Sequence, residues 1–296
     1  MSFKVVGIGE VLWDLLPSGK QLGGAPANFA YHAAALGAEG RIVSRVGRDA
    51  NGRELIQRLT QLSLGTDCIE IDSTAPTGTV SVEVAPDGQP HFTIRENVAW
   101  DHIAGEAAAR RAVAEANAVC FGTLAQRSET SQASIRRLLS LAASEALRVF
   151  DVNLRQHFYS RELIEQSLAL ANVLKVNEGE LPRLAEMLDI GGDARAQMSG
   201  LAARYPLQVV ACTRGAHGSL LLASGRWSDH PGVPAKVVDT VGAGDAFTAA
   251  MTLGFLSGWD LDDINHHANH IASFVASCRG GTPELPQQLR APFLAR

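Results

Sequence analysis

The stretch Asp239-Thr240-Val241-Gly242-Ala243-Gly244-Asp245-Ala246-Phe247 is the most informative part of this sequence for the fold. The small residues 242–244 lead directly into a segment of helical spacing, 245–257, which stops at Gly258. Glycines let successive backbone N–H groups point outward at a helix N-terminus, and such N–H groups bind anions. Asp245 would lie in the first helical turn. There it is either a group beside a bound anion or a simple cap that the helix dipole favours.

Around this stretch, short β-branched runs alternate with Ala- and Leu-rich stretches of helical spacing. The predicted strands are 4–8, 40–46, 118–122, 147–152, 173–176, 207–212 and 219–222. The predicted helices are 27–36, 52–61, 106–116, 131–145, 161–171, 178–188, 194–205, 245–257 and 262–278. Alternation of this kind predicts an α/β fold with a mostly parallel sheet covered by helices on both faces. Ligands of such sheets bind at the carboxyl ends of the strands.

One region breaks the alternation of strands and helices. Residues 79–85 alternate apolar and polar side chains, Pro86-Asp87-Gly88 has turn chemistry, and 92–95 runs back. This pattern predicts a β-hairpin with one apolar face. Because an isolated hairpin is unstable in water, it must cover something. It is either an edge meander of the main sheet or a lid over a site.

Composition and charge narrow the class of protein. The 296 residues are 46% apolar and 19% charged, with a formal charge of −5, so neither nucleic acid nor an anionic membrane is indicated as a partner. No stretch approaches the ~20 apolar residues of a membrane span. The N-terminus enters a strand without the apolar region of a secretory signal, and the four cysteines form no C-x-x-C pair. We therefore expect a cytoplasmic protein.

A second glycine-rich segment, Gly23-Gly24-Ala25-Pro26-Ala27-Asn28, lies near the N-terminus. Its glycines permit close approach of a ligand, and Asn28 offers a donor and an acceptor unless it is a plain helix-terminal residue. Asp14 lies upstream in an apolar run, where a carboxylate either caps a turn or binds hydroxyl groups. Gly7-Ile8-Gly9 lacks the third glycine of a dinucleotide fingerprint, and no G-x-x-x-x-G-K-[ST] occurs. The sequence thus argues against Rossmann and Walker-type sites.

The two glycine-rich segments together resemble a known family. Residues 23–47 resemble the N-terminal signature of the ribokinase-like (PfkB-type) carbohydrate kinases, and 239–252 resemble the C-terminal signature. The positions that carry the first signature are Gly24, Asn28, Gly37 and Gly47. The segments 9–14 and 95–101 look most like those of bacterial fructokinases. The resemblance covers essentially the whole chain.

This resemblance implies a ribokinase-like three-layer α/β/α fold with a mostly parallel central sheet. It implies one kinase domain over residues 1–296 and a small β-sheet lid formed by about 10–24 and 76–101. The implied reaction is ATP-dependent phosphorylation of a sugar hydroxyl, with fructose converted to fructose 6-phosphate. The alternatives are a kinase of the same fold for another sugar, a sugar acid or a nucleoside, or a non-catalytic sugar- or nucleotide-binding protein. The presence of Asp245 argues against the last of these.

The resemblance also assigns roles at the 239–247 stretch. Asp245 matches the base that takes the proton of the attacking hydroxyl, and it therefore also touches the substrate. Gly242, Ala243 and Gly244 match an anion hole whose N–H groups hold the γ-phosphate. The chemistry agrees, because phosphoryl transfer needs mainly in-line positioning and neutralisation of charge.

Other matching positions fall at the sugar. Asp14, Gly23, Gly24 and Asn28 match ligands of the sugar hydroxyls. Arg155, in the D-x-N-x-R segment 151–155, matches a group that reaches sugar or phosphate oxygens, or else it is an arginine of a surface salt bridge. The segment Leu124-Ala125-Gln126 differs from ribose-specific members, which have a glutamate there, and this favours a ketohexose.

The cofactors implied are ATP and Mg²⁺. Asn177 and Glu180 match the N-x-x-E motif, which acts through magnesium and its waters, although Glu180 could instead compensate a helix dipole. The loop 213–218 matches the loop at the nucleotide phosphates, and Asn269 and Ser273 match positions beside the adenine unless they are core-facing polar residues. The implied nucleotide-binding residues are Asn177, Thr213, Arg214, Gly215, Gly218, Gly242, Gly244, Asn269 and Ser273.

Many members of the family are activated by a monovalent cation such as K⁺. Here the matching ligands are the Asp239 carboxylate and the carbonyls of Val241, Ala276, Arg279 and Gly281. The stretch 283–286 departs from the ribokinase pattern, so K⁺ dependence stays open.

Two further expectations concern surfaces. The lid hairpins of two subunits could pair, which predicts a homodimer whose other partners are the small-molecule sugar and ATP. His266, His267 and His270 lie on the same predicted helix without a supporting Cys or carboxylate cluster. We therefore interpret them as surface or packing residues and not as metal ligands.

Overall fold

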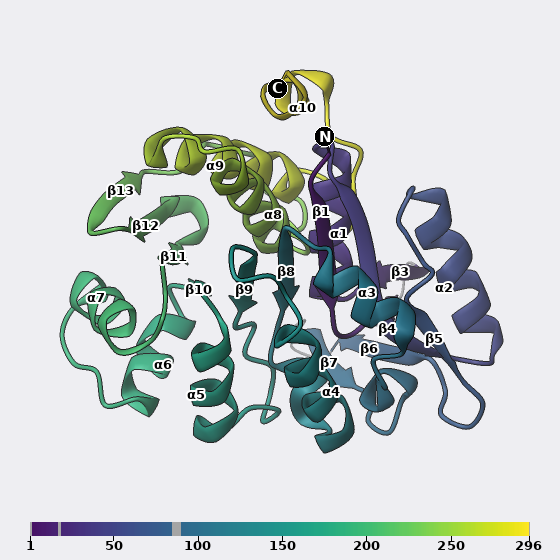
Figure 1. The fold of residues 1–296 in the computed structure, drawn as a ribbon. Helices are drawn as coiled ribbons and strands as arrows, with labels where there is room; N and C mark the ends of the chain where they lie inside the picture. The colour runs from purple at the N-terminus through teal and green to yellow at the C-terminus, as the bar shows by residue number, and fades with distance from the viewer. Residues whose placement is uncertain (1, 17–18, 85–89, 296) are drawn as a thin grey trace.

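The computed structural model describes residues 2–16, 19–84 and 90–295, which form a large sheet with helices on both faces (Figure 1). The strand order is β13-β12-β11-β10-β9-β8-β1-β4-β5. The strands are β1 (Lys4–Ile8), β4 (Glu39–Gly47), β5 (Ile69–Asp72), β8 (Ala118–Phe121), β9 (Leu147–Asp151), β10 (Val173–Asn177), β11 (Val209–Thr213), β12 (Ser219–Ala223) and β13 (Arg226–His230). Neighbours from β11 to β5 pair in parallel, whereas β12 and β13 are antiparallel additions at one edge. The predicted mostly parallel sheet is confirmed.

Alternation along each strand divides the core between the two helical layers. Val6 and Ile8 of β1 pack with Leu138 and other residues of one layer, whereas Val5 packs with Phe29 and Phe247 of the other. The first layer contains α3 (Ala107–Ala114), α4 (Glu129–Leu139), α5 (Arg161–Leu170), α6 (Glu180–Met187) and α7 (Ala194–Arg204). The second contains α1 (Ala25–Ala35), α8 (Ala243–Leu256) and α9 (Leu261–Ala276), and α2 (Ala50–Gln61) packs beside α1. Because both faces are covered, the central strands are mainly apolar, as in β8 and β11.

Helix α8 is the most enclosed helix of the second layer. Every residue from Asp245 to Gly254 is buried, and α8 lies between α1 and α9. A helix that is apolar on all sides is stable only inside the protein. Its N-terminus is Gly242, whose φ of 78° is left-handed and therefore favours glycine. The tertiary structure thus fixes α8 with its N-terminus at the carboxyl edge of the sheet.

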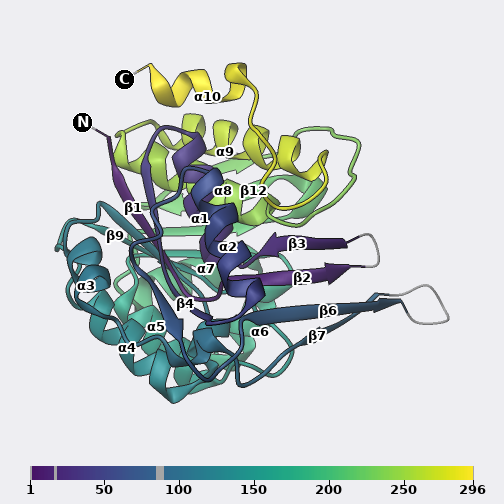
Figure 2. The same ribbon diagram turned by 90° about the vertical axis from the view of Figure 1, so that its right-hand side faces the viewer.

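A separate small sheet projects beside this edge, as Figure 2 shows. Its order is β3-β2-β6-β7, with β2 (Leu12–Leu16), β3 (Gly19–Gly23), β6 (Gly78–Val84) and β7 (Pro90–Ile94). The predicted hairpin is confirmed as β6 and β7, which pair in antiparallel fashion. The interpretation of this hairpin as an edge meander of the main sheet is wrong, because it belongs to the separate small sheet. The turn predicted at 86–88 lies outside the described residues.

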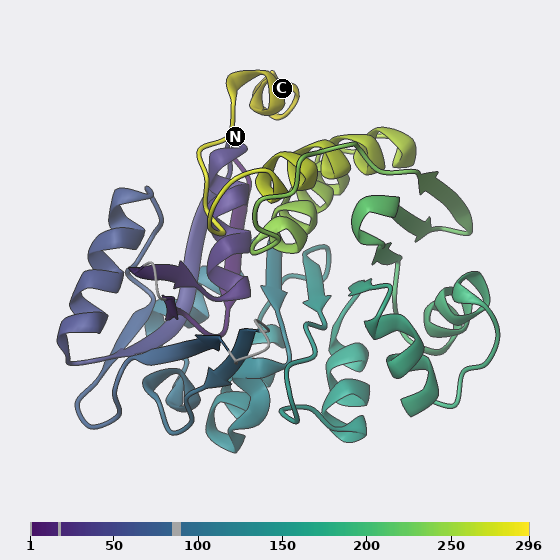
Figure 3. The same cartoon turned by 180° about the vertical axis from the view of Figure 1, so that it is seen from behind.

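Three elements were not predicted from the sequence. Strands β5 and β13 lie at the two edges of the sheet; β5 alternates as Ile-Glu-Ile-Asp but is only four residues long, and β13 is mostly polar. Helix α10 (Gln287–Leu294) packs against the end of α1, where Arg290 Nε donates to the Ala35 carbonyl at 2.8 Å (Figure 3).

Among the described residues, none of the helices combines the length and apolar character that crossing a bilayer requires.

Candidate active site

A cavity of about 1380 Å³ opens at the carboxyl ends of the strands. Its walls include Gly122, Asn153, Asn177 and Thr213, at or just after the ends of β8, β9, β10 and β11. The small sheet closes one side of it, with Leu12, Asp14, Leu16, Gln21, Val80 and Ile94. This volume exceeds the roughly 300–1,000 Å³ that holds one drug-sized ligand. The cavity is large enough for two substrates at once.

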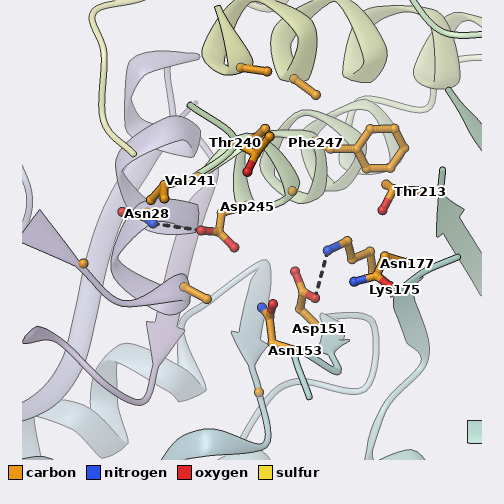
Figure 4. Close-up of a pocket in the computed structure, with 18 of the residues that line it drawn as sticks. Asn28, Asp151, Asn153, Lys175, Asn177, Thr213, Thr240, Val241, Asp245 and Phe247 are labelled. Carbon is orange, nitrogen blue, oxygen red and sulfur yellow. Dashed lines mark hydrogen bonds and ion pairs between the residues drawn. The ribbon is translucent and has the colours of Figure 1, made fainter. Parts of the chain in front are cut away.

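Asp245 lines this cavity from the first turn of α8 (Figure 4). The side chain is 8% exposed, and its Oδ2 accepts a hydrogen bond of 2.8 Å from Asn28 Nδ2 at the start of α1. Burial, together with the nearby Asp151, raises the pKa of Asp245 from 3.8 to about 6, although Asn28 and Lys175 act in the opposite direction. A carboxyl group poised in this range both accepts and releases protons near neutral pH.

The N-terminus of α8 faces the same space. Gly242, Ala243 and Gly244 line the cavity, and first-turn N–H groups of a helix have no acceptor within the helix. Ala243 N–H makes a long bond of 3.3 Å to the Thr240 carbonyl. The positive end of the helix dipole therefore lies next to Asp245, as an anion site requires.

Lys175 supplies a second positive charge that the sequence reasoning missed. Its Nζ donates to Asp151 Oδ1 at 3.1 Å, and a Cβ on Gly244 would lie 3.0 Å from the same Nζ. Burial alone would lower the pKa of the Lys175 ammonium, but Asp151, Glu180 and Asp245 outweigh it and the pKa is raised. Thr248 Oγ1 donates a hydrogen bond of 3.1 Å to the other carboxylate oxygen of Asp151, Oδ2. The available signal was a lone lysine within the apolar strand β10.

The end of the cavity near the small sheet is lined by carboxyl groups. Burial raises the pKa of Asp14 to about 6 and that of Glu10 to about 7, while Arg155 lowers both. Gly23 allows Asp14 its position, because a Cβ there would lie 2.4 Å from Asp14 Oδ2. Gly24 also lines the cavity.

Three buried polar atoms on the cavity wall have no hydrogen-bond partner among the described residues. They are Glu10 Oε2, Asn28 Oδ1 and Asn153 Nδ2. Buried polar groups of native proteins are normally paired, so these atoms indicate where a polar ligand binds. A polyhydroxylated molecule could satisfy all three.

Comparison with known proteins agrees with this geometry. The family model described as pfkB family carbohydrate kinase matches residues 18–288. The chain belongs to this family. It is 31% identical over 310 residues to a fructokinase of Klebsiella pneumoniae, covering 97% of each chain, and 29% identical over 305 residues to a fructokinase of Escherichia coli, again covering 97% of each. A solved sugar kinase from Pyrococcus horikoshii, in complex with ATP, has a TM-score of 0.83 at 27% identity, covering 98% of this chain and 100% of that one.

In this carbohydrate kinase the predicted Arg155 lies in the cavity wall just after β9. Its guanidinium donates to Asn153 Oδ1 at 3.0 Å and lies close enough to Asp14 and Asp245 to lower the pKa of both. The position favours the predicted contact with substrate oxygens over a surface salt bridge.

The N-x-x-E motif of the kinase joins two strand ends. Glu180 Oε1 accepts Leu154 N–H at 3.0 Å and Oε2 accepts Asn177 N–H at 2.9 Å, while Asn177 Oδ1 caps α6 by accepting Glu180 N–H at 2.9 Å. Asn177 and Glu178 line the cavity, whereas Glu180 lies behind them. The first task of Glu180 is therefore to hold the ends of β9 and β10 together.

Three of the four residues assigned to the nucleotide in the loop 213–218 face the cavity. Thr213, Gly215 and Gly218 line the cavity. Arg214 does not, because its Nη2 donates to Asp229 Oδ1 at 2.6 Å and to the His230 carbonyl at 3.0 Å. The Arg214 guanidinium therefore binds residues of β13 and does not face the cavity, so the structure gives no support to its assignment to the nucleotide.

Asn269 and Ser273 of α9 both line the cavity, and the Asn269 amide nitrogen and the Ser273 hydroxyl donate to other residues of the protein. Asn269 Nδ2 donates to Ser219 Oγ at 2.7 Å, and Ser273 Oγ donates to the Val233 carbonyl at 3.1 Å. They shape the wall of the cavity, as core-facing polar residues do.

The predicted cation ligands connect two loops. Asp239 Oδ1 and Oδ2 accept the N–H groups of Val241 and Gly280, each at 3.0 Å. The Ala276 carbonyl accepts Val238 N–H at 2.9 Å, and the Gly281 carbonyl pairs with His32 Nε2 at 2.9 Å.

The segment 124–126, where ribose-specific members have a glutamate, reaches the cavity through one residue. Gln126 is buried, and its Nε2 donates to the Gly122 carbonyl at 2.8 Å and to Ser167 Oγ at 3.0 Å. The side chain that reaches the cavity from this segment is Leu124. Gln126 therefore does not select the substrate.

Proposed function

We propose that this kinase transfers the γ-phosphoryl group of ATP to a hydroxyl of a sugar, and that D-fructose is the sugar and fructose 6-phosphate the product. The observation that carries this proposal is the place of Asp245. It lines the cavity from the first turn of α8, beside Gly242, Ala243 and Gly244. The comparisons support this proposal through the fructokinases of similar sequence and the ATP complex of the P. horikoshii kinase.

In the proposed reaction, ionised Asp245 accepts the proton of the sugar hydroxyl as the oxygen attacks the γ-phosphorus. Asn28 fixes the orientation of the carboxylate through the bond to Oδ2. The N–H groups of Gly242 and Gly244, with the Lys175 ammonium behind them, face the charge that builds on the transferred group. This arrangement needs no covalent intermediate.

Magnesium would neutralise the nucleotide phosphates during the transfer. The residues present fit a hard cation that keeps several waters, because the carboxyl groups of Asp151 and Glu178 line this end of the cavity. Each Glu180 oxygen accepts one N–H and keeps a further lone pair for a magnesium-bound water. We keep Glu180 in that proposed role.

At the sugar end, the unpaired atoms of Glu10 and Asn28, together with Asp14 and Arg155, offer acceptors and a donor to several hydroxyl groups. Leu12, Val80 and Ile94 provide the apolar wall of the small sheet. Closing this lid over the sugar would exclude water and limit hydrolysis of ATP.

The test is a panel of acceptors with Mg-ATP, in which ADP release is coupled to an optical signal. We expect kcat/KM to be highest for D-fructose, with the 6-phosphate as product. A higher kcat/KM for another sugar, a sugar acid or a nucleoside would support the kinase activity but contradict D-fructose as the substrate. If no acceptor gave ATP-dependent turnover, the proposed kinase activity would be contradicted.

Potassium activation belongs to the same proposal. Each Asp239 oxygen and the Gly281 carbonyl accept one protein hydrogen bond and keep a lone pair for a cation, whereas the Ala276 carbonyl already accepts the N–H groups of Val238 and Asp239. Together with the carbonyls of Val241 and Arg279 they would order the loop before α8. Turnover measured in KCl and in NaCl at equal ionic strength tests activation by K⁺. Equal rates in the two salts would contradict the proposed cation site.

We also propose that two copies pair through their lids. The cavity lies on the face of β2 that carries Leu12, Asp14 and Leu16, so Leu15, which is 38% exposed, lies on the other face. Among the described residues, the outer strands of this sheet, β3 and β7, pair with no further strand. Exposed edges and apolar faces favour association. A monomer in sedimentation at micromolar protein would contradict the dimer.

A further inference from the structure

Three histidines meet at the edge of the large sheet that carries β13. His266 and His270 are one turn apart on α9, and His230 is the last residue of β13, the strand that packs against α9. One ring nitrogen from each residue lies within 4.8 Å of one from each of the others. The sequence placed two of these side chains on one helix, and the third comes from a strand that the sequence did not reveal.

The hydrogen bonds of two rings define where their lone pairs lie. His270 Nδ1 is 2.9 Å from the His266 carbonyl, which only accepts, so Nδ1 carries the proton and Nε2 keeps a free lone pair. A hydrogen bond of this kind orients a histidine for metal binding. His230 Nδ1 accepts the Gly232 N–H at 3.1 Å, so the proton of the neutral ring is on Nε2.

Coordination by His230 therefore has a structural consequence. If Nδ1 binds a metal, the Gly232 N–H loses its acceptor. If Nε2 binds the metal, the proton moves to Nδ1, which then no longer accepts. In both cases the bond from Gly232 breaks, and the next residue, Val233, is part of the cavity wall.

The charges around the cluster permit a cation. Arg214 approaches His230, but its guanidinium is paired with Asp229 at 2.6 Å. His266 is exposed, and His230 and His270 are half-buried, so an ion can enter from solvent. The His267 ring lies 5.3 Å from that of His266 between centroids, but it faces Trp259 at 5.0 Å and Phe293 at 5.9 Å and is not one of the three residues whose ring nitrogens converge.

We propose that His230, His266 and His270 form a binding site for one divalent transition-metal ion, such as Zn²⁺, Ni²⁺ or Co²⁺, with water in the remaining position. Imidazole nitrogen suits these ions and does not suit Mg²⁺. A tetrahedral Zn²⁺ ion with bonds of about 2.0–2.1 Å places its ligand atoms about 3.3 Å apart. Binding would therefore draw the three nitrogens, now within 4.8 Å of one another, closer together by rotation of the exposed or half-buried rings. The interpretation of His266 and His270 as mere surface residues changes accordingly, whereas His267 is a packing residue.

The experiment uses the full chain without an affinity tag, since a histidine tag would itself bind these metals. Equilibrium dialysis against Zn²⁺, and separately Co²⁺, measures stoichiometry and affinity near neutral pH. We expect one ion per chain. Each of His230→Ala, His266→Ala and His270→Ala should weaken binding at least about 10- to 100-fold, the loss that removal of even an outer partner of a ligand causes. His267→Gln, on the same helix, is the matched control and should bind like the unaltered protein.

Two further readouts separate the site from general loss of structure. Circular dichroism and thermal unfolding of the metal-free variants should match those of the unaltered protein. Metal should accelerate hydrogen exchange of the Gly232 amide in the unaltered protein and not in His266→Ala. Equal metal uptake by the unaltered protein and His266→Ala, or an equal loss in His267→Gln, would overturn the proposal.

Discussion

Replacing Asp245 with asparagine should move activity and stability in opposite directions. Burial raises the pKa of Asp245 from 3.8 to about 6. One pKa unit is about 1.4 kcal/mol, so the ionised carboxylate costs the folded state about 3 kcal/mol above that pKa. Asparagine has almost the same shape and accepts the Asn28 hydrogen bond through its carbonyl oxygen, but it carries no charge. The variant should therefore unfold less readily than the unaltered protein.

The pH dependence fixes the sign of this effect. Between pH 3.8 and about 6 the folded state keeps the Asp245 proton while the unfolded chain releases it, so this carboxyl group makes stability fall as pH rises. The advantage of Asp245→Asn should accordingly be below about 1 kcal/mol near pH 4 and reach about 3 kcal/mol above about pH 7. Turnover should fall by about 10²–10⁴, the usual loss when a positioned base is removed.

Urea denaturation near pH 4 and near pH 7.5 gives the stability, and the coupled ADP assay gives the turnover. Asp151→Asn is the matched control, because it makes the same substitution in the same cavity but breaks the ion pair with Lys175. Loss of one partner of a buried pair costs about 3–5 kcal/mol, so this control should be destabilised. If Asp245→Asn is less stable than the unaltered protein at pH 7.5, or turns over within tenfold of it, our account of Asp245 is wrong.

Three other predictions concern the same cavity. Arg155→Ala should raise KM for the sugar or lower kcat with little change in thermal stability, and unchanged kinetics would show that the arginine only faces solvent. Asn28→Ala removes a hydrogen bond that lowers the pKa of Asp245, so the acidic limb of kcat against pH, expected near pH 6, should move to higher pH; an unmoved limb would contradict this coupling. Lys175→Met leaves Asp151 unpaired and should lose about 3–5 kcal/mol in urea denaturation as well as turnover; normal kinetics in the folded variant would remove Lys175 from the site.

The layered fold was within reach of the sequence because its signals are local. Runs such as 5–8 and 118–122 contain only apolar residues and glycine, as is typical of strands covered on both faces, and the intervening helices show their own period. The sequence did not reveal the edge strands β5 and β13, because β5 is only four residues long and β13 is mostly polar.

The sequence by itself determined that an acidic residue follows a glycine-rich turn at the start of a helix, because backbone freedom and helix polarity depend on neighbours in the chain. Only the tertiary structure brought Asn28 to Asp245, 217 residues apart, and Lys175 to Gly244. It also turned Arg214 and Gln126 away from the cavity, and it brought His230 to His266. The direction of each of these side chains depends on which strands are neighbours in the sheet, and that pairing is set by contacts between distant parts of the chain.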